Sequence, residues 1–429
     1  MSKPITVSSL PGSDPYRGWI VTFAGMGINL ALGVLYAWSV ISKQIAKEWG
    51  WNETQTALPY SVAIALFAFM MVPAGRLQDK FGPRLVATLG GIFCGIGFII
   101  AGLGQSLTGL IIGFGILAGT GIGCGYASAT PPAVKWFPSA RTGLIAGVVV
   151  AGFGLASVYI APLANYLLSR FGIQSSFLIL GFAFFIVIVL LATLLKNPSA
   201  GYKPLGNPIA TKALPKGDAQ SASITKDYEW HEMLLTPQFY LLWIMFVFGA
   251  GAGLMIIGKL AKIVDLQAGI KAGFVFVALL AVGNAAGRIV AGMLSDRIGR
   301  TRTMFMVFVF QAILMFFLRG LDTYGTLVLA SVLIGFNYGA NLSVFPSATK
   351  DYFGMKNFGV NYGFVFTAWG VGGVLGPVLS GWIFDSSQNF NNAYLIASVC
   401  LVIAAGLTFF THAPKGKKEI EEKVLQKAA

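Results

Sequence analysis

The stretch FVFVALLAVGNAAGRIVAGML, residues 274–294, is apolar over a length that can cross a bilayer, yet it carries Arg288 near its centre. About 20 helical residues span the hydrocarbon core of a membrane. A central arginine costs about 2.5–3.5 kcal/mol on insertion scales, and a guanidinium stays charged at any physiological pH. The stretch itself holds no Asp or Glu. We therefore expect an anion that binds and leaves to balance this charge.

The composition of the whole chain is that of a membrane protein. Hydrophobic residues make up 56% of the sequence and charged residues 11%, far from the balance of a soluble domain. The N-terminus is short and polar, so we expect no cleavable signal peptide. The sequence predicts an all-α integral membrane protein with twelve transmembrane helices, near residues 18–41, 54–74, 85–105, 107–131, 141–166, 173–195, 238–259, 271–294, 302–319, 324–347, 358–384 and 392–412.

The net charge of +14 is placed asymmetrically along these spans. Both termini and the even-numbered loops hold 22 of the 30 Lys and Arg residues, and the odd-numbered loops hold 7. The positive-inside rule then predicts a multi-pass protein of the cell inner (plasma) membrane with both termini cytoplasmic. The basic excess is a topology signal, and we expect no nucleic-acid partner.

The sequence repeats itself at about half its length. GRLQDKFGPR begins at Gly75 and GMLSDRIGRTR at Gly292, 217 residues later, and VKWFPSAR (134–141) is echoed by TKDYFGMK (349–356). In both halves the first motif follows the second span and the second motif follows the fourth. Two six-helix pseudo-symmetric halves of like topology are predicted, as in transporters built from parallel repeats.

The repeat and the local composition divide the chain into four expected parts. The stretch between the halves is rich in Lys, Pro, Gly and Ser, which is typical of a linker. Its end, ITKDYEWHEMLLTP, forms either an interfacial helix or a solvated connector. The predicted parts are an N-terminal half (1–195), a cytoplasmic linker (196–236), a C-terminal half (237–413) and a cytoplasmic basic tail (414–429).

The doubled loop motif, G-x-L-x-D-[RK]-x-G, is similar to the signature of the major facilitator superfamily. The resemblance covers the whole chain and implies that superfamily's fold. Acidic residues in these loops can pair with basic neighbours or cap a helix start and so hold the halves together in one state. The alternative is that the basic residues here only anchor the topology. The residues predicted to form this conformational latch are Asp79, Arg84, Asp296 and Arg300.

A narrower resemblance comes from DPYRGW (14–19), KWFPSARTGLIAG (135–147) and NAAGR (284–288). These stretches are similar to the monocarboxylate transporter family, including its bacterial members, and to the related oxalate:formate antiporters. Asn284 and Arg288 are four residues apart and share a helix face. The guanidinium could grip a carboxylate bidentately while Asn284 donates to a neighbouring oxygen. The alternative is a static ion pair between Arg288 and another helix, but no span has Asp or Glu in its central stretch.

Aromatic side chains match positions that the antiporters use in their binding-site helices. The resemblance implies that they form apolar walls around a small organic chain, the tyrosines adding a hydroxyl. Each is equally consistent with ordinary packing. These candidates are Tyr36, Tyr126, Tyr338 and Phe366, with Tyr362, Asn337 and Asn341 as weaker ones.

Two departures from these relatives define the expected substrate. Trp369 stands where oxalate transporters have a second intramembrane cation, so one carboxylate is favoured over two. Asn284 stands where animal monocarboxylate transporters have Asp, and the lysine they carry on helix one is missing from YAWSV (36–40). We expect a secondary active transporter for small monocarboxylates such as lactate or pyruvate, working by alternating access. The family implies proton symport, whereas this chain lacks the aspartate and the lysine that are associated with proton coupling in the animal transporters.

Two other functions remain open. One is a carboxylate exchanger of the oxalate/formate type, and the other is a membrane sensor that binds an anion without moving it. Enzymatic activity is not expected, because the spans lack a nucleophile–base pair. The three cysteines are scattered without a CxxC, so neither a metal site nor a disulfide is indicated, and no cofactor is expected. Besides substrate, the expected partners are protons and the lipid bilayer, and we expect a monomer.

Overall fold

The computed structural model describes residues 15–51, 53–199, 202, 227–270 and 273–414, and these residues contain helices and no strands. The basic tail and most of the linker lie outside the described residues. The helices are α1 (Pro15–Leu32), η2 (Gly33–Ala37), α2 (Trp38–Trp49), α3 (Glu53–Phe81), α4 (Pro83–Gly104), α5 (Leu107–Leu110), η3 (Ile111–Ala118), α6 (Gly119–Lys135), η4 (Ser139–Arg141), α7 (Thr142–Ala192), α8 (Trp230–Leu234), α9 (Pro237–Ala268), α10 (Gly273–Ile298), α11 (Arg300–Leu318), α12 (Tyr324–Phe353), α13 (Phe358–Ser387), α14 (Asn391–Leu407) and η7 (Thr408–Phe410).

These elements form the twelve predicted spans. The first span is α1, the 3₁₀ stretch η2 and α2 in succession, and the fourth is α5, the π-helical stretch η3 and α6. Helix α7 has 51 residues and contains two spans, because Gly172 breaks the helical backbone at φ 72° and ψ 177°. The remaining spans are single helices, each long and apolar enough to cross a membrane. The expectation of twelve transmembrane helices is confirmed.

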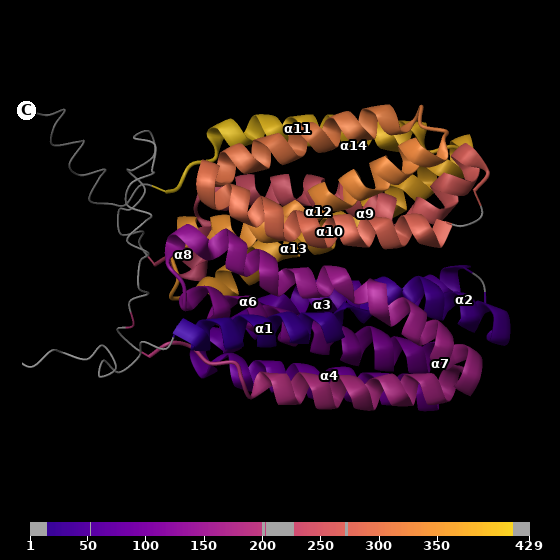
Figure 1. Ribbon diagram of the computed structural model, residues 1–429, viewed down its shortest axis with the longest axis horizontal. Helices are drawn as coiled ribbons and strands as arrows, with labels where there is room; N and C mark the ends of the chain where they lie inside the picture. The colour runs from indigo at the N-terminus through magenta and orange to yellow at the C-terminus, as the bar shows by residue number, and fades with distance from the viewer. Residues whose placement is uncertain (1–14, 52, 200–201, 203–226, 271–272, 415–429) are drawn as a thin grey trace, which may run out of the picture.

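The spans gather into two bundles, which lie one above the other in Figure 1. In the first half, α4 packs against α6 and α7, and in the second half α11 packs against α12 and α14. Two pairs of helices join the halves: α3 packs on α13, and α10 packs on α7. This arrangement confirms the two-half architecture. The short helix α8 lies at one end of the bundles (Figure 1), and we call this end the α8 end.

The two pairs that join the halves touch through glycines. A Cβ added to Gly75 on α3 would lie 2.2 Å from the carbonyl oxygen of Gly359 on α13. One added to Gly143 on α7 would lie 2.2 Å from the carbonyl oxygen of Gly292 on α10. Small residues let helix backbones approach where lipid gives no hydrophobic driving force. The halves are therefore in backbone contact at two related places.

The outer surface of the spans is apolar. Trp382 is 70% exposed and Phe69 66% exposed, among many other large hydrophobic side chains on the outside of both halves. Contiguous exposure of this kind is unfavourable in water and is expected where lipid covers the helices. The protein is a multi-pass membrane protein.

Candidate substrate-binding site

Arg288 lies on α10 and reaches across the junction of the halves to α7. Its side chain is fully buried. Nη1 donates to the carbonyl oxygen of Val150 on α7, and Nε donates to Oδ1 of Asn284 at 2.9 Å. The approach is possible because Gly154, one turn beyond Val150, has no side chain: a Cβ there would lie 3.2 Å from Nε. The local sequence of both helices thus positions the guanidinium.

The charge of Arg288 is balanced by neutral oxygens alone. No Asp or Glu side chain of the described residues forms an ion pair with it, and Nη2 is buried without a hydrogen-bond partner. A buried donor left unpaired is costly, and more so when it is charged. The static ion pair considered from the sequence is not found among the described residues. One nitrogen of the guanidinium is therefore free to bind an anion.

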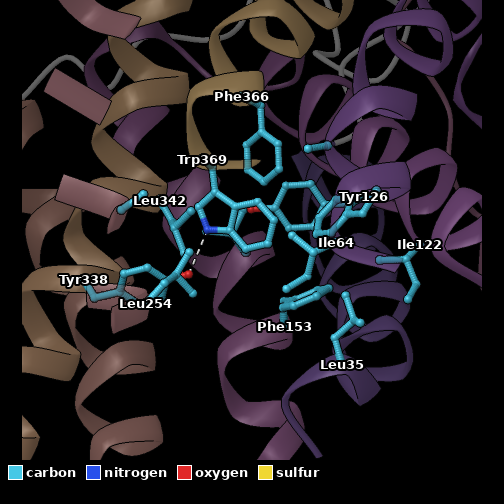
Figure 2. Packing of buried hydrophobic residues seen from close by; sticks show 14 of the residues in the cluster. Leu35, Ile64, Ile122, Tyr126, Phe153, Leu254, Tyr338, Leu342, Phe366 and Trp369 are labelled. Atoms are coloured by element: carbon cyan, nitrogen blue, oxygen red, sulfur yellow. Dashed lines mark hydrogen bonds between the residues drawn. The ribbon is translucent and has the colours of Figure 1, made fainter. Parts of the chain in front are cut away.

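An aromatic cluster fills the space between the halves beside Arg288. Figure 2 shows Phe366 and Trp369 of α13 on one side and Tyr126 of α6 and Phe153 of α7 on the other. The rings of Tyr126 and Phe366 are 5.3 Å apart between centroids, and Phe366 stacks on Trp369 at 5.1 Å. Phe67 of α3 contacts Tyr126, Phe153, Phe366 and Trp369, all within 5.8 Å. The cluster is an apolar wall assembled from both halves.

Three polar groups form a chain across the cluster. Nε1 of Trp369 donates to the hydroxyl of Tyr338 at 2.8 Å (Figure 2), and this hydroxyl lies 3.1 Å from that of Tyr36. Tyr36 belongs to η2 of the first half, whereas the other two residues belong to the second. This chain therefore bonds the halves together on the side of the cluster away from α8. Arg288 is close enough to Tyr126 and Tyr338 for its charge to act on their hydroxyls.

The structure thus brings six of the sequence candidates to the same region as Arg288, and it adds residues that the sequence did not single out. The six are Asn284, Tyr36, Tyr126, Tyr338, Phe366 and Tyr362. Asn284 contacts the guanidinium directly, whereas Asn337 and Asn341 donate to backbone carbonyls of their own helix. Phe67, Phe153, Val150 and Gly154 were missed. For Val150 and Gly154, the signal in the sequence was Gly154 itself, a glycine on the face of α7 that meets α10.

The latch residue Asp79 lies at the α8 end. Its carboxylate accepts hydrogen bonds from the backbone N–H groups of Gly359 at 3.2 Å and Val360 at 2.9 Å, in the first turn of α13. A carboxylate at a helix N-terminus is stabilised by the unpaired N–H groups and the helix dipole. Arg84 does not join it, and donates instead to the carbonyl oxygen of Thr193.

Asp296 makes the equivalent contact in the other direction. It accepts from the N–H groups of Gly143 at 2.8 Å and Leu144 at 2.9 Å, in the first turn of α7. Arg300 bonds Asp296 at 2.6 Å and Asp351 at 2.8 Å, so this side carries an ion-pair network. Each aspartate bonds the first turn of a helix in the opposite half, and the two halves are closed together at the α8 end.

No metal-binding cluster comes together in the part of the chain that the structure describes. No three His, Cys, Asp or Glu side chains there lie close enough to hold an ion. Cys94, Cys124 and Cys400 are unpaired thiols. The groups that meet in this region are one charged donor, several hydroxyls and apolar walls.

Comparison with known proteins agrees with this architecture. The family model of the Major Facilitator Superfamily matches residues 18–282 and 264–428. The chain belongs to this superfamily. Its overlapping matches cover both halves, as expected for a protein built from a repeat.

Three relatives within the superfamily are similar in sequence to this chain over most of its length. The oxalate:formate antiporter of Oxalobacter formigenes is 28% identical over 415 residues, covering 96% of this chain and 94% of that protein. The MFS-type transporter YhjX of Escherichia coli (strain K12) is 28% identical over 369 residues, covering 85% and 88%. Human monocarboxylate transporter 11 is 25% identical over 394 residues, covering 89% and 80%.

Solved structures share the fold at low sequence identity. A double-tryptophan mutant of XylE superposes with a TM-score of 0.73 at 15% identity, covering 96% of this chain and 99% of that one. The human organic anion transporter MFSD10 superposes with a TM-score of 0.66 at 13% identity, covering 92% and 99%. The protein is a transporter of the Major Facilitator Superfamily whose relatives include carriers of organic anions.

Proposed function

We propose that this protein is a secondary active transporter for small monocarboxylates, such as lactate or pyruvate, that works by alternating access. The observation that carries the proposal is Nη2 of Arg288, a fully buried charged donor without a partner at the junction of the two halves. A carboxylate would satisfy this donor and neutralise the charge. Similarity to the oxalate:formate antiporter and to monocarboxylate transporter 11 supports an organic acid as the substrate.

The surrounding residues supply orientation and size selection. Asn284 fixes the guanidinium through Oδ1 and lies where it could meet an oxygen of the substrate. Tyr36, Tyr126, Tyr338 and Phe366 enclose the carbon skeleton. Trp369, stacked on Phe366, offers an indole where a second substrate charge would need a cation. A dianion would bury that charge against an apolar ring at a large desolvation cost, so one carboxylate is favoured.

Proton symport is the coupling that we propose, because it makes uptake of an anion electroneutral. The described residues put no Asp or Glu beside Arg288 to carry the proton. Binding of the carboxylate neutralises the guanidinium and favours reorientation of the loaded carrier. Under this proposal Asp79 and Asp296, with Arg300 as the basic partner of Asp296, act as the latch that keeps the cytoplasmic side shut, and Arg84, which bonds Thr193 within its own half, is not part of it.

The placement in the membrane follows from the same proposal. The α8 end faces the cytoplasm, and the protein acts as a monomer in the cell inner membrane. Its functional parts are the halves 1–195 and 237–413, the linker 196–236 and the tail 414–429. The charge distribution over the loops supports this orientation.

Uptake of labelled lactate into liposomes carrying the purified protein tests the role of Arg288. Arg288→Ala should abolish uptake, and Arg288→Lys should reduce it at least about tenfold, because an ammonium lacks the planar geometry of the guanidinium. Competition with acetate, pyruvate, formate and oxalate ranks the substrates, and oxalate should compete least. Arg319→Ala is the matched control, since Arg319 lies over the ring of Phe316 on the α11 end remote from α8. Normal uptake by Arg288→Ala would refute the proposal.

An imposed pH gradient separates the proposed coupling from its alternatives. If protons travel with lactate, a pH gradient with an acidic exterior and an alkaline interior should drive accumulation of lactate inside the liposomes. Counterflow without net uptake would instead identify an exchanger of the oxalate/formate type. Specific binding without any movement of lactate into the vesicles would identify an anion sensor.

A further inference from the structure

The hydrogen-bond donors of Arg288 can be accounted for one by one. Nε donates to Asn284 and one of the two N–H groups of Nη1 donates to the carbonyl oxygen of Val150, so Nη2 is the one nitrogen of the guanidinium without a partner. A carboxylate has two oxygens, and bidentate binding needs two donors in fork geometry. In this conformation Asn284 already uses Nε, the neighbour of Nη2 in the side-on fork, so Nη2 pairs with one carboxylate oxygen and a donor from elsewhere can pair with the second.

Three tyrosine hydroxyls lie within the electrostatic reach of Arg288, those of Tyr126, Tyr338 and Tyr362. The hydroxyl of Tyr338 is already engaged by Trp369 and Tyr36. The hydroxyl of Tyr362, on α13, is buried and lies near enough to that of Tyr126 to interact with it, but the two are outside hydrogen-bond geometry. A buried hydroxyl left unpaired carries a desolvation cost. Tyr362 is thus the second unpaired donor in the neighbourhood of Arg288.

We propose that Tyr362 is a further substrate-binding residue, whose hydroxyl donates a hydrogen bond to the carboxylate oxygen that Arg288 leaves unpaired. The inference rests on the proposed function of Arg288. It names the part of the substrate that Tyr362 contacts, the carboxylate itself. Unsubstituted acids such as acetate and substituted acids such as lactate and pyruvate then depend on Tyr362 alike.

The ring of Tyr362 is held in place independently of its hydroxyl. It stacks on Phe358 at 5.9 Å and meets Phe366 edge-on at 5.7 Å. Tyr362→Phe therefore removes the donor and keeps the packing. Tyr394 provides a matched control, because it is also buried and its hydroxyl also lacks a partner, but it lies on α14 and lines a separate cavity of about 340 Å³ with Arg319 and Asp322.

The test compares lactate and acetate uptake by Tyr362→Phe and Tyr394→Phe in liposomes. Tyr362→Phe should raise KM about 10- to 100-fold for both acids, the usual effect of losing a hydrogen bond to a charged group, while kcat stays within about threefold. Tyr394→Phe should leave KM unchanged. Protection of the protein by lactate against thermal unfolding should be lost in Tyr362→Phe and kept in Tyr394→Phe.

Three results would overturn the inference. The KM of Tyr362→Phe could match that of Tyr394→Phe, Tyr126→Phe could carry the increase in place of Tyr362→Phe, or Tyr362→Phe could lose its folded state in the absence of substrate. Arg288→Ala separates this inference from the function beneath it. If Arg288→Ala is inactive and Tyr362→Phe is normal, only the role of Tyr362 is wrong; if Arg288→Ala transports normally, the proposed function fails first.

Discussion

The two junctions between the halves, α3 on α13 and α10 on α7, are built alike at the α8 end and differ in the middle of the membrane. Both have a glycine contact with a carbonyl 2.2 Å from an added Cβ, and both have an aspartate bonded to the first turn of the opposite helix. In mid-membrane, Met71 of α3 occupies the position 217 residues before Arg288. The repeated scaffold therefore needs no charge there, as expected if Arg288 serves the proposed function.

The latches also differ in their charge. Asp296 shares Arg300 with Asp351, whereas Pro83 stands at the position equivalent to Arg300, and Arg84 bonds Thr193. The second repeated motif differs in the same way: the first half has Trp136 at the position where the second half has the acidic residue Asp351. One junction thus concentrates both the ion-pair network and the buried guanidinium. The two junctions therefore share their closing contacts and differ in their charged residues.

The largest expected difference between the junctions is the effect of removing a basic residue. Arg300→Gln leaves two partly buried carboxylates without their cation, so the free energy of unfolding should fall by about 3–5 kcal/mol. Arg84→Gln removes one exposed hydrogen bond and should cost about 1 kcal/mol or less. Thermal unfolding of both variants in the same detergent measures the difference. Equal losses would mean that the network does not distinguish the two junctions.

Placing a charge on the uncharged junction should be nearly as damaging. Met71 is fully buried, and Met71→Arg has no matching anion site, so it should cost about 2.5–3.5 kcal/mol. Met71→Leu keeps the volume and should cost less than about 1.5 kcal/mol. The yield of folded protein and its unfolding temperature report both effects. Wild-type behaviour of Met71→Arg would contradict the view that only α10 provides a place for a guanidinium.

The smallest difference is expected for the glycine contacts, which should respond alike. Gly75→Ala and Gly143→Ala each force a Cβ against an opposing carbonyl, which should destabilise the closed contact by about 1–3 kcal/mol. Lactate uptake should fall by a similar factor in both. Gly381→Ala is the control, because no atom lies within 4 Å of a Cβ there. A loss confined to one variant would show that only that junction must close during transport.

The sequence predicts the fold well because membrane spans are long, apolar and doubled in this chain. Twelve runs of about 20 residues and two copies of a loop motif suffice for the architecture. The isolated Arg288 could also be found, since a charge in such a run is rare and costly. The division of α7 at Gly172 followed from the two apolar runs on either side of RFG (170–172).

The hydrogen-bond and packing partners of the predicted residues could not be predicted from the sequence. The oxygen that receives Nη1 of Arg288 is the backbone carbonyl of Val150, 138 residues away, and a carbonyl has no signature in a sequence. Phe67 and Phe153 are two of 34 phenylalanines, and their gathering around Tyr126 depends on how the halves dock. The use of Arg300 by two carboxylates, and of Arg84 by none, depends equally on tertiary contact.

The 3₁₀ stretch η2 gives the first span a length that can change without unfolding. A 3₁₀-helix rises about 2.0 Å per residue and an α-helix about 1.5 Å, so rewinding Gly33–Ala37 into α-helical form would shorten the span by about 2.5 Å. The same rewinding would turn the phenol ring of Tyr36 about the helix axis and draw α2 toward the bilayer centre. The helical form of this stretch therefore links the position of α2 to the contact between Tyr36 and Tyr338.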